Sequence, residues 1–195
     1  MSKLALEKLQ AHFGDGVIET HSHLGDDTAV VKPEIWKEVC EFLRKDSALD
    51  FDLFVDLTAV DYPDRIPRLE VVLHLYSVGK RQRIRLKARI GDEELAGLEI
   101  DSITSIWMGA NWFERETYDM FGVTFRGHPD LRRILMYPEF VGHPLRKDYA
   151  ANKTQPLIPY RTESDAGVIL DKVAPFGADE GMSFGRKFLP AKEES

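Results

Sequence analysis

The chain has 195 residues, of which 43% are hydrophobic and 30% are charged, which is the composition of an ordinary globular protein with room for a core. Its formal net charge is −7 and it has no isolated basic stripe, which argues against a nucleic-acid-binding protein. Its single cysteine, Cys40, excludes both an intrachain disulfide and a cysteine-ligated iron–sulfur cluster, and we expect it to be a small buried side chain.

The sequence contains no apolar run long enough to span a bilayer. Its first residues form no signal-peptide core, and they are not arginine-rich and acid-poor as in a mitochondrial presequence. We therefore expect the protein to stay in the compartment where it is made, the bacterial cytoplasm, and to meet a membrane only through partners.

Helical and strand patterns are mixed along the first half of the chain. Periodicity predicts helices over residues 3–13 and from Pro33 to about residue 47. Strands are predicted over residues 17–23 and 28–31, around a turn at Gly25, and over residues 51–60, 69–77 and 83–90. Residues 91–100 are predicted to form a connector, which the pattern allows to be either a loop or a helix.

The strand at residues 83–90 alternates cleanly, and its outward side chains are all cationic. A charged strand resists mispairing, so we expect it at an edge of the sheet. Hairpins outnumber repeated strand–helix units. The predicted fold class is therefore α+β, a mixed or antiparallel sheet with helices on one face, followed by an extended C-terminal tail.

A short helix of about three turns is predicted between Asn111 and Gly122. Asn111 is a suitable N-cap with Glu114 three residues later, and Gly122 follows where a left-handed stop is favoured. Phe113, Thr117, Met120 and Phe121 form one apolar stripe. Local spacing pairs Arg115 with Asp119 at i+4, and contact with a partner protein is the alternative.

The tripeptide Gly-His-Pro then occurs twice, at residues 127–129 and 142–144, each time followed by leucine and a basic pair. Proline biases the preceding histidine towards an extended backbone, and glycine permits the turn before it. We interpret these segments as two similar loops in which His128 and His143 serve as hydrogen-bonding anchors rather than proton carriers.

Together, residues 114–122 and the two loops through Tyr149 resemble the C subunit of NADH–quinone oxidoreductase, respiratory complex I, whose mitochondrial counterpart is the iron–sulfur protein 3 subunit. The resemblance rests on the segments Glu-Arg-Glu, Asp-Met-Phe-Gly, Leu-Arg-Arg-Ile-Leu and Gly-His-Pro-Leu-Arg-Lys-Asp-Tyr. It implies a non-catalytic, cofactor-free subunit of the peripheral arm, on the cytoplasmic side of the bacterial inner membrane. The implied partners are chiefly the D subunit and the iron–sulfur subunits.

Two other functions stay open: the equivalent subunit of a membrane-bound hydrogenase, and a stand-alone acid/base enzyme that uses Glu116, Asp119 and a histidine. A metal site at His21, His23, Asp26 and Asp27 is the less favoured interpretation of four polar residues near a turn. The interval from Gly122 to Gly127 lacks the lysine of a phosphate loop. We therefore predict no catalytic, cofactor-binding or metal-binding residue in this chain.

The predicted organisation has three parts: an N-terminal α/β domain over residues 1–108, the motif region over 109–149, and a partner-binding tail over 150–195. The tail holds scattered apolar clusters between prolines and glycines and cannot build a core of its own. The residues that we expect at a partner interface are Trp112, Phe113, Arg115, Glu116, Tyr118, Asp119, His128, Arg132, Arg133, His143, Arg146, Lys147 and Tyr149.

Overall fold

The computed structural model describes residues 3–92 and 95–156. The helices are α1 (Lys3–Phe13), α2 (Trp36–Lys45) and α3 (Ala110–Phe121), with 3₁₀ turns at Gly14–Gly16 and Pro33–Ile35. The strands are β1 (Val17–His23), β2 (Asp26–Val31), β3 (Leu53–Asp61), β4 (Leu69–Ser77), β5 (Gln82–Ile90), β6 (Glu99–Asp101) and β7 (Thr124–Arg126). The predicted tail lies, except for its first residues, outside the described part of the chain.

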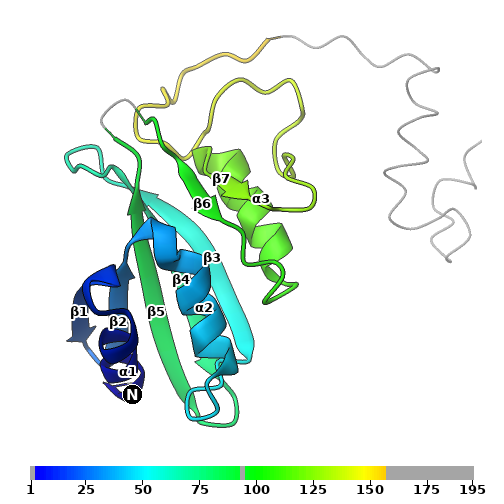
Figure 1. Ribbon diagram of the computed structural model, residues 1–195. Helices are drawn as coiled ribbons and strands as arrows, with labels where there is room; N and C mark the ends of the chain where they lie inside the picture. The colour runs from blue at the N-terminus through cyan, green and yellow to red at the C-terminus, as the bar shows by residue number, and fades with distance from the viewer. Residues whose placement is uncertain (1–2, 93–94, 157–195) are drawn as a thin grey trace, which may run out of the picture. The chain divides into compact units, whose positions relative to one another are not determined.

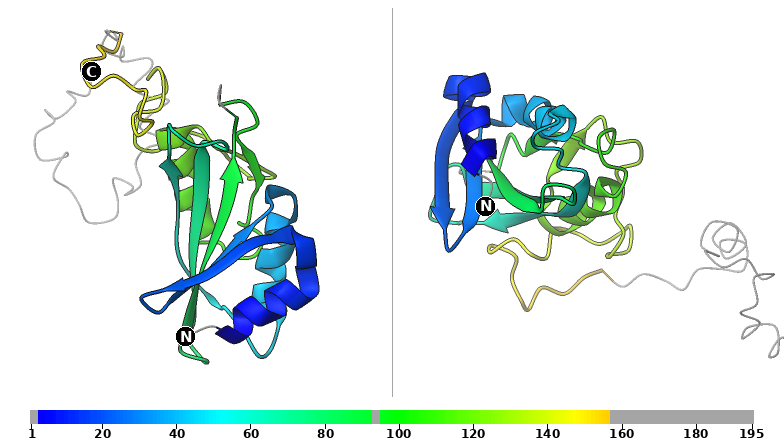
Figure 2. Two further views of the ribbon diagram at one scale, coloured as in Figure 1. Left: turned by 90° about the vertical axis from the view of Figure 1, so that its left-hand side faces the viewer. Right: turned by 90° about the horizontal axis from the view of Figure 1, so that it is seen from below.

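The main sheet has five strands in the order β1-β2-β5-β4-β3 (Figure 1). All neighbouring strands are antiparallel except β2 and β5, which are parallel, so the sheet is mixed. The helices gather on one side of it (Figure 2). The predicted α+β class is therefore confirmed. Two short strands, β6 and β7, pair in parallel as a separate small sheet.

The core lies between the helices and the inward side chains of β4 and β5. The apolar stripe of α2, Trp36, Val39, Cys40 and Leu43, is fully buried, because these residues recur at helical spacing and face the sheet. The prediction that Cys40 is a buried side chain is confirmed. Burial raises the pKa of the Cys40 thiol well above its ordinary value, which disfavours the reactive thiolate.

The expectation that residues 83–90 form an edge strand is wrong. β5 lies between β2 and β4, and the edges are β1 and β3. Its cations do not repel neighbouring strands, because acids on those strands pair with them. Glu70 on β4, which is buried, accepts from Lys87 at 2.7 Å and from Arg89 at 3.4 Å.

The connector between β5 and β6 forms no helix in its described residues, 91–92 and 95–98. Within the described ranges, no helix is both long enough and apolar enough to cross a bilayer.

Candidate functional site

Helix α3 packs against the edge strand β3 and carries most of the motif residues. The rings of Phe113 and Phe54 meet edge to face at 5.2 Å, and the Thr117 hydroxyl donates to the Leu57 carbonyl at 3.4 Å. The helix ends as predicted, because Gly122 adopts the left-handed conformation with φ 78° and its N–H donates to the Tyr118 carbonyl.

The predicted capping box at the start of α3 is wrong. Residue Gly109 precedes the helix, and no side chain caps it. The Glu114 side chain is instead fully buried, and its Oε1 accepts from the Ile103 N–H at 2.8 Å. Burial raises the pKa of Glu114 to about 7, against the opposing effect of its hydrogen bonds with Ser102 and Ile103. The helix is thus joined to the turn after β6 by a carboxyl group that titrates near neutrality.

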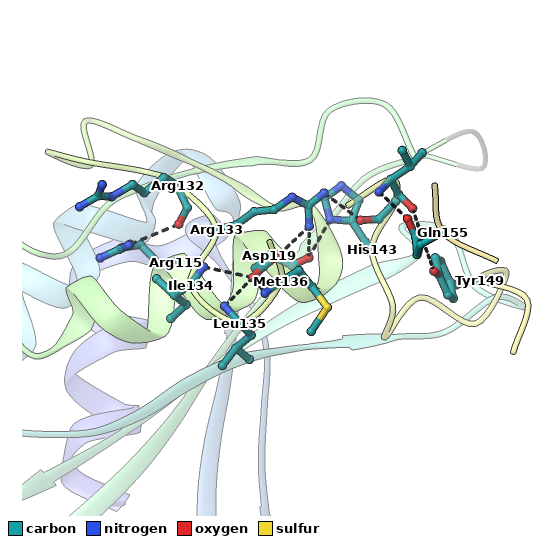
Figure 3. Close-up of polar contacts among 12 residues, drawn as sticks. Arg115, Asp119, Arg132, Arg133, Ile134, Leu135, Met136, His143, Tyr149 and Gln155 are labelled. Atoms are coloured by element: carbon teal, nitrogen blue, oxygen red, sulfur yellow. Dashed lines mark hydrogen bonds and ion pairs between the residues drawn. The ribbon is translucent and has the colours of Figure 1, made fainter. Parts of the chain in front are cut away.

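Asp119 organises the chain that follows α3 (Figure 3). Its Oδ2 accepts from the N–H groups of Ile134, Leu135 and Met136 at 3.1, 2.8 and 2.8 Å, and its Oδ1 pairs with Arg133. Burial opposes the charge on this carboxylate, but the four donors outweigh it and hold the pKa of Asp119 below its usual range. We call this arrangement the Asp119 clasp.

The Arg115–Asp119 pair suggested by local spacing does not form. The Arg115 Nε donates to the Arg132 carbonyl at 3.2 Å, and its guanidinium lies over the Trp112 ring. The carboxylate of Asp119 is occupied by the clasp, and Glu116 is exposed. Asp119 is therefore not free to act with Glu116 as a catalytic pair.

The second Gly-His-Pro loop closes over the C-terminus of α3. His143 Nδ1 donates to the Asp119 carbonyl at 3.0 Å, Leu145 N–H donates to the Met120 carbonyl at 3.1 Å, and Arg146 Nε donates to the Phe121 carbonyl at 2.6 Å. Cationic and N–H donors at this position satisfy carbonyls that the helix leaves unpaired. Burial lowers the pKa of His143, which favours the neutral ring, and the hydrogen bond from Nδ1 anchors the loop to α3.

The first loop is anchored in the same manner at the other end of the helix. The Asp130 N–H donates to His128 Nδ1 at 3.0 Å, so Nε2 carries the hydrogen and donates to the Asn111 carbonyl at 3.3 Å. Burial lowers the pKa of His128, and the nearby Arg115 charge acts in the same direction. Both histidines thus hydrogen-bond to backbone carbonyls of α3, as expected of anchors.

A second buried carboxylate, Asp61 at the end of β3, ties the motif region to the sheet. Arg68 donates to both of its oxygens, at 2.7 and 2.8 Å, and the Lys147 N–H donates to Oδ2 at 2.7 Å. Sequence reasoning missed this site, because Asp61 stands in a segment with a plain turn signal. Its partner at Lys147 is a backbone group that no side-chain pattern reveals.

The remaining aromatic candidates also have intrachain contacts. Tyr118 meets the His143 ring at 6.3 Å, and Tyr149 stacks on Phe140 at 6.0 Å. Gln155 donates to the Tyr149 hydroxyl and binds the Val141 backbone in both directions (Figure 3).

The predicted interface residues therefore divide into two groups. Nine are only partly exposed or buried and contact the chain itself: Phe113, Arg115, Tyr118, Asp119, His128, Arg133, His143, Arg146 and Tyr149. The exposed members are Trp112, Glu116, Arg132 and Lys147. Across residues 3–92 and 95–156, no group of three or more histidine, cysteine or acidic side chains is placed to hold a metal ion, and His21, His23, Asp26 and Asp27 form no such group.

Comparisons with known proteins extend over both the sheet and the motif region. Residues 29–155 match the family model described as the 30 kDa subunit of respiratory-chain NADH dehydrogenase. The chain is 41% identical over 171 residues to the C 2 subunit of NADH-quinone oxidoreductase from Rhizobium etli, covering 88% of this chain and 81% of that protein. It is 47% identical over 146 residues to the C subunit from Geobacter metallireducens, covering 74% and 87%.

Two solved structures share the fold. The trypsin-resistant fragment (1–134) of Nqo5 superposes with a TM-score of 0.56 at 30% identity, covering 65% of this chain and 99% of the fragment. A chain of the membrane-bound sulfane sulfur reductase, an archaeal respiratory membrane complex, gives a TM-score of 0.65 at 20% identity, covering 100% of this chain and 96% of that chain. At that identity the second likeness concerns the fold alone.

Proposed function

The chain belongs to the family of the 30 kDa subunit of respiratory-chain NADH dehydrogenase, and on this premise we propose that it serves as the C subunit of an NADH–quinone oxidoreductase. In this role it holds the peripheral arm together and carries neither a cofactor nor a catalytic residue. The proposed partners are chiefly the D subunit and the iron–sulfur subunits, on the cytoplasmic side of the bacterial inner membrane.

The observation that carries the proposal is the extent of the family match. The match runs from residue 29, within β2, to Gln155, and so includes β3, β4 and β5 of the main sheet together with the Asp119 clasp. Relatives named as the C subunit of NADH-quinone oxidoreductase are 40–51% identical to this chain. Their names favour the NADH–quinone oxidoreductase role over the equivalent position in a hydrogenase-type complex.

The chemistry of the motif region agrees with a supporting role. Its buried acids and both histidines bind backbone groups and arginines of the same chain, which stabilises a fixed surface and leaves no acid–base pair free. Such groups position a loop; they do not transfer protons to a substrate.

Affinity purification tests the proposal. A tagged copy of the full chain, extracted from native membranes in mild detergent, should bring with it a flavoprotein that binds NADH and the subunits that carry iron–sulfur clusters. Recovery of a nickel-containing large subunit instead would support the hydrogenase alternative, and recovery of the chain alone would refute the subunit role.

A further inference from the structure

An exposed aromatic–cation pair lies on α3, at the end away from the Gly122 stop. Trp112 is 63% exposed, and the Arg115 guanidinium carbon lies 5.2 Å from the centre of its ring. Met108, one turn earlier in the chain, is 89% exposed. Large apolar side chains are seldom left in water together, so this group requires an explanation.

The charge of Arg115 is not compensated within the described chain. Its Nε donates to a carbonyl, that of Arg132, and within residues 3–92 and 95–156 no carboxylate lies within 4.0 Å of its guanidinium. Arg132 differs, because it pairs with Asp130 at 3.0 Å. Arg133 differs further, because it is held in the Asp119 clasp.

Figure 3 shows how the three arginines lie relative to one another. Arg115 and Arg132 lie together at one end of the network, while Arg133 points inward to Asp119. The Arg115 guanidinium lies over the Trp112 ring and its Nε donates to the Arg132 carbonyl, so two contacts favour this orientation before any partner arrives. A pre-positioned guanidinium without an acid is complementary to a carboxylate.

A hollow borders Met108 on the side of strand β3. It has a volume of about 370 Å³, and its lining includes Leu53, Phe54, Ile106 and Trp107 together with Arg44 and Asp52. The hollow is large enough to receive an apolar side chain, and the two charged residues at its border have opposite signs.

Building on the proposed subunit role, we propose that Met108, Trp112 and Arg115 form the docking surface for one segment of a neighbouring subunit. That segment brings an aspartate or glutamate carboxylate to Arg115 and apolar side chains to Trp112 and the hollow beside Met108. Tryptophan and arginine are the residue types that dominate binding at protein interfaces. The charge complementarity at Arg115 selects an acidic segment.

Photo-crosslinking in the assembled protein tests this surface. A benzoylphenylalanine is placed at position 112 of the full tagged chain, and at position 24 as a control, where Leu24 is 91% exposed in the β1–β2 turn. After irradiation of native membranes, position 112 should cross-link to another protein of the assembly, at a peptide with Asp or Glu close to the cross-linked residue. Position 24 should give no such product.

Charge reversal gives a second readout. Arg115→Glu should lower the amount of chain recovered with the assembly roughly tenfold, because like charges across an interface repel, while Arg115→Lys should retain most of it. Arg81→Glu, an exposed arginine in the β4–β5 turn, is the matched control and should match the wild type. Thermal melting of each purified variant separates loss of folding from loss of docking. If Arg115→Glu does not fold, the cross-link at position 112 remains the test of the surface.

The surface is refuted if position 112 cross-links only to a second copy of this chain, or to nothing, while the tagged chain still co-purifies with other subunits. It is also refuted if folded Arg115→Glu is recovered as well as the wild type. In both cases the subunit role stands. If the wild-type chain itself is recovered without other subunits, the role and the surface fail together.

Discussion

Arg133 binds Asp119 twice, because one guanidinium nitrogen contacts both the carboxylate and the backbone carbonyl of that residue. Its other terminal nitrogen donates to the Gly142 carbonyl at 2.9 Å. One side chain therefore links α3, the segment after the first Gly-His-Pro loop and the start of the second. The neighbouring Arg132, by contrast, is 67% exposed and pairs only on the surface with Asp130.

Replacing these two neighbouring arginines should change the stability of the fold by very different amounts. Arg133→Ala leaves the buried Asp119 without its cation, and the free energy of unfolding should fall by about 3–5 kcal/mol. Arg132→Ala removes a surface pair and should change it by less than about 1 kcal/mol. Urea denaturation of the purified chain, followed by circular dichroism, measures both. Equal effects of the two substitutions would show that the clasp does not stabilise the fold.

Glu114 should make stability fall with rising pH. The pKa of this buried carboxyl is raised to about 7 from an ordinary value near 4.5, so the folded chain holds a proton that the unfolded chain has lost between these values. Between pH 4.5 and pH 7 the free energy of unfolding is therefore highest at the acid end and decreases as the pH rises. The total decrease is about 3 kcal/mol, reached once Glu114 is ionised in the folded state.

Glu114→Gln is the matched variant, because the amide oxygen can still accept from Ile103 while the group no longer titrates. Relative to wild type it should gain stability as the pH rises from 5 to 8. Denaturation curves at several pH values check this, with the exposed Glu116→Gln as control. A constant difference between Glu114→Gln and wild type across that range would contradict the assignment.

Gly122 should tolerate alanine less well than another glycine of the same region. Both Gly122 and Gly127 have φ near +80°, where a side chain costs about 1–2 kcal/mol. A methyl group at Gly122 would also meet Arg146 and His143, whereas at Gly127 it would meet nothing within 4 Å. Gly122→Ala should therefore be the more destabilising in a thermal melt. Similar melting temperatures for the two variants would mean that the second Gly-His-Pro loop can move away from the added methyl group without loss of stability.

The elements that could be predicted from the sequence are those set by local pattern. Helix α1, strand β4 and the stop at Gly122 follow from periodicity and one glycine. The central position of β5 could not be predicted, because its cations are compensated by acids such as Glu70 on a neighbouring strand and because β2 pairs with it in parallel over a long separation. The sequence of a charged strand, read without its neighbours in the sheet, predicts an edge strand.

The contacts of the site depend on distant groups in the same way. Local spacing predicted that Arg115 pairs with Asp119. Instead, Arg133, fourteen positions away, binds that carboxylate together with three backbone N–H groups, which have no sequence signature. Glu114 was expected to cap its own helix and instead binds Ile103 eleven positions earlier. The motif identified the family correctly, but its residues are used for self-organisation as much as for contact.

Deletion of the chain tests the subunit role most directly. Membranes from a strain that lacks it should lose NADH–quinone reductase activity, and the wild-type chain supplied in trans should restore it, although the purified chain alone oxidises no NADH. The activity should be lost because assembly fails, visible as absence of the intact complex on a native gel. Full quinone reductase activity in the deletion strain would contradict it.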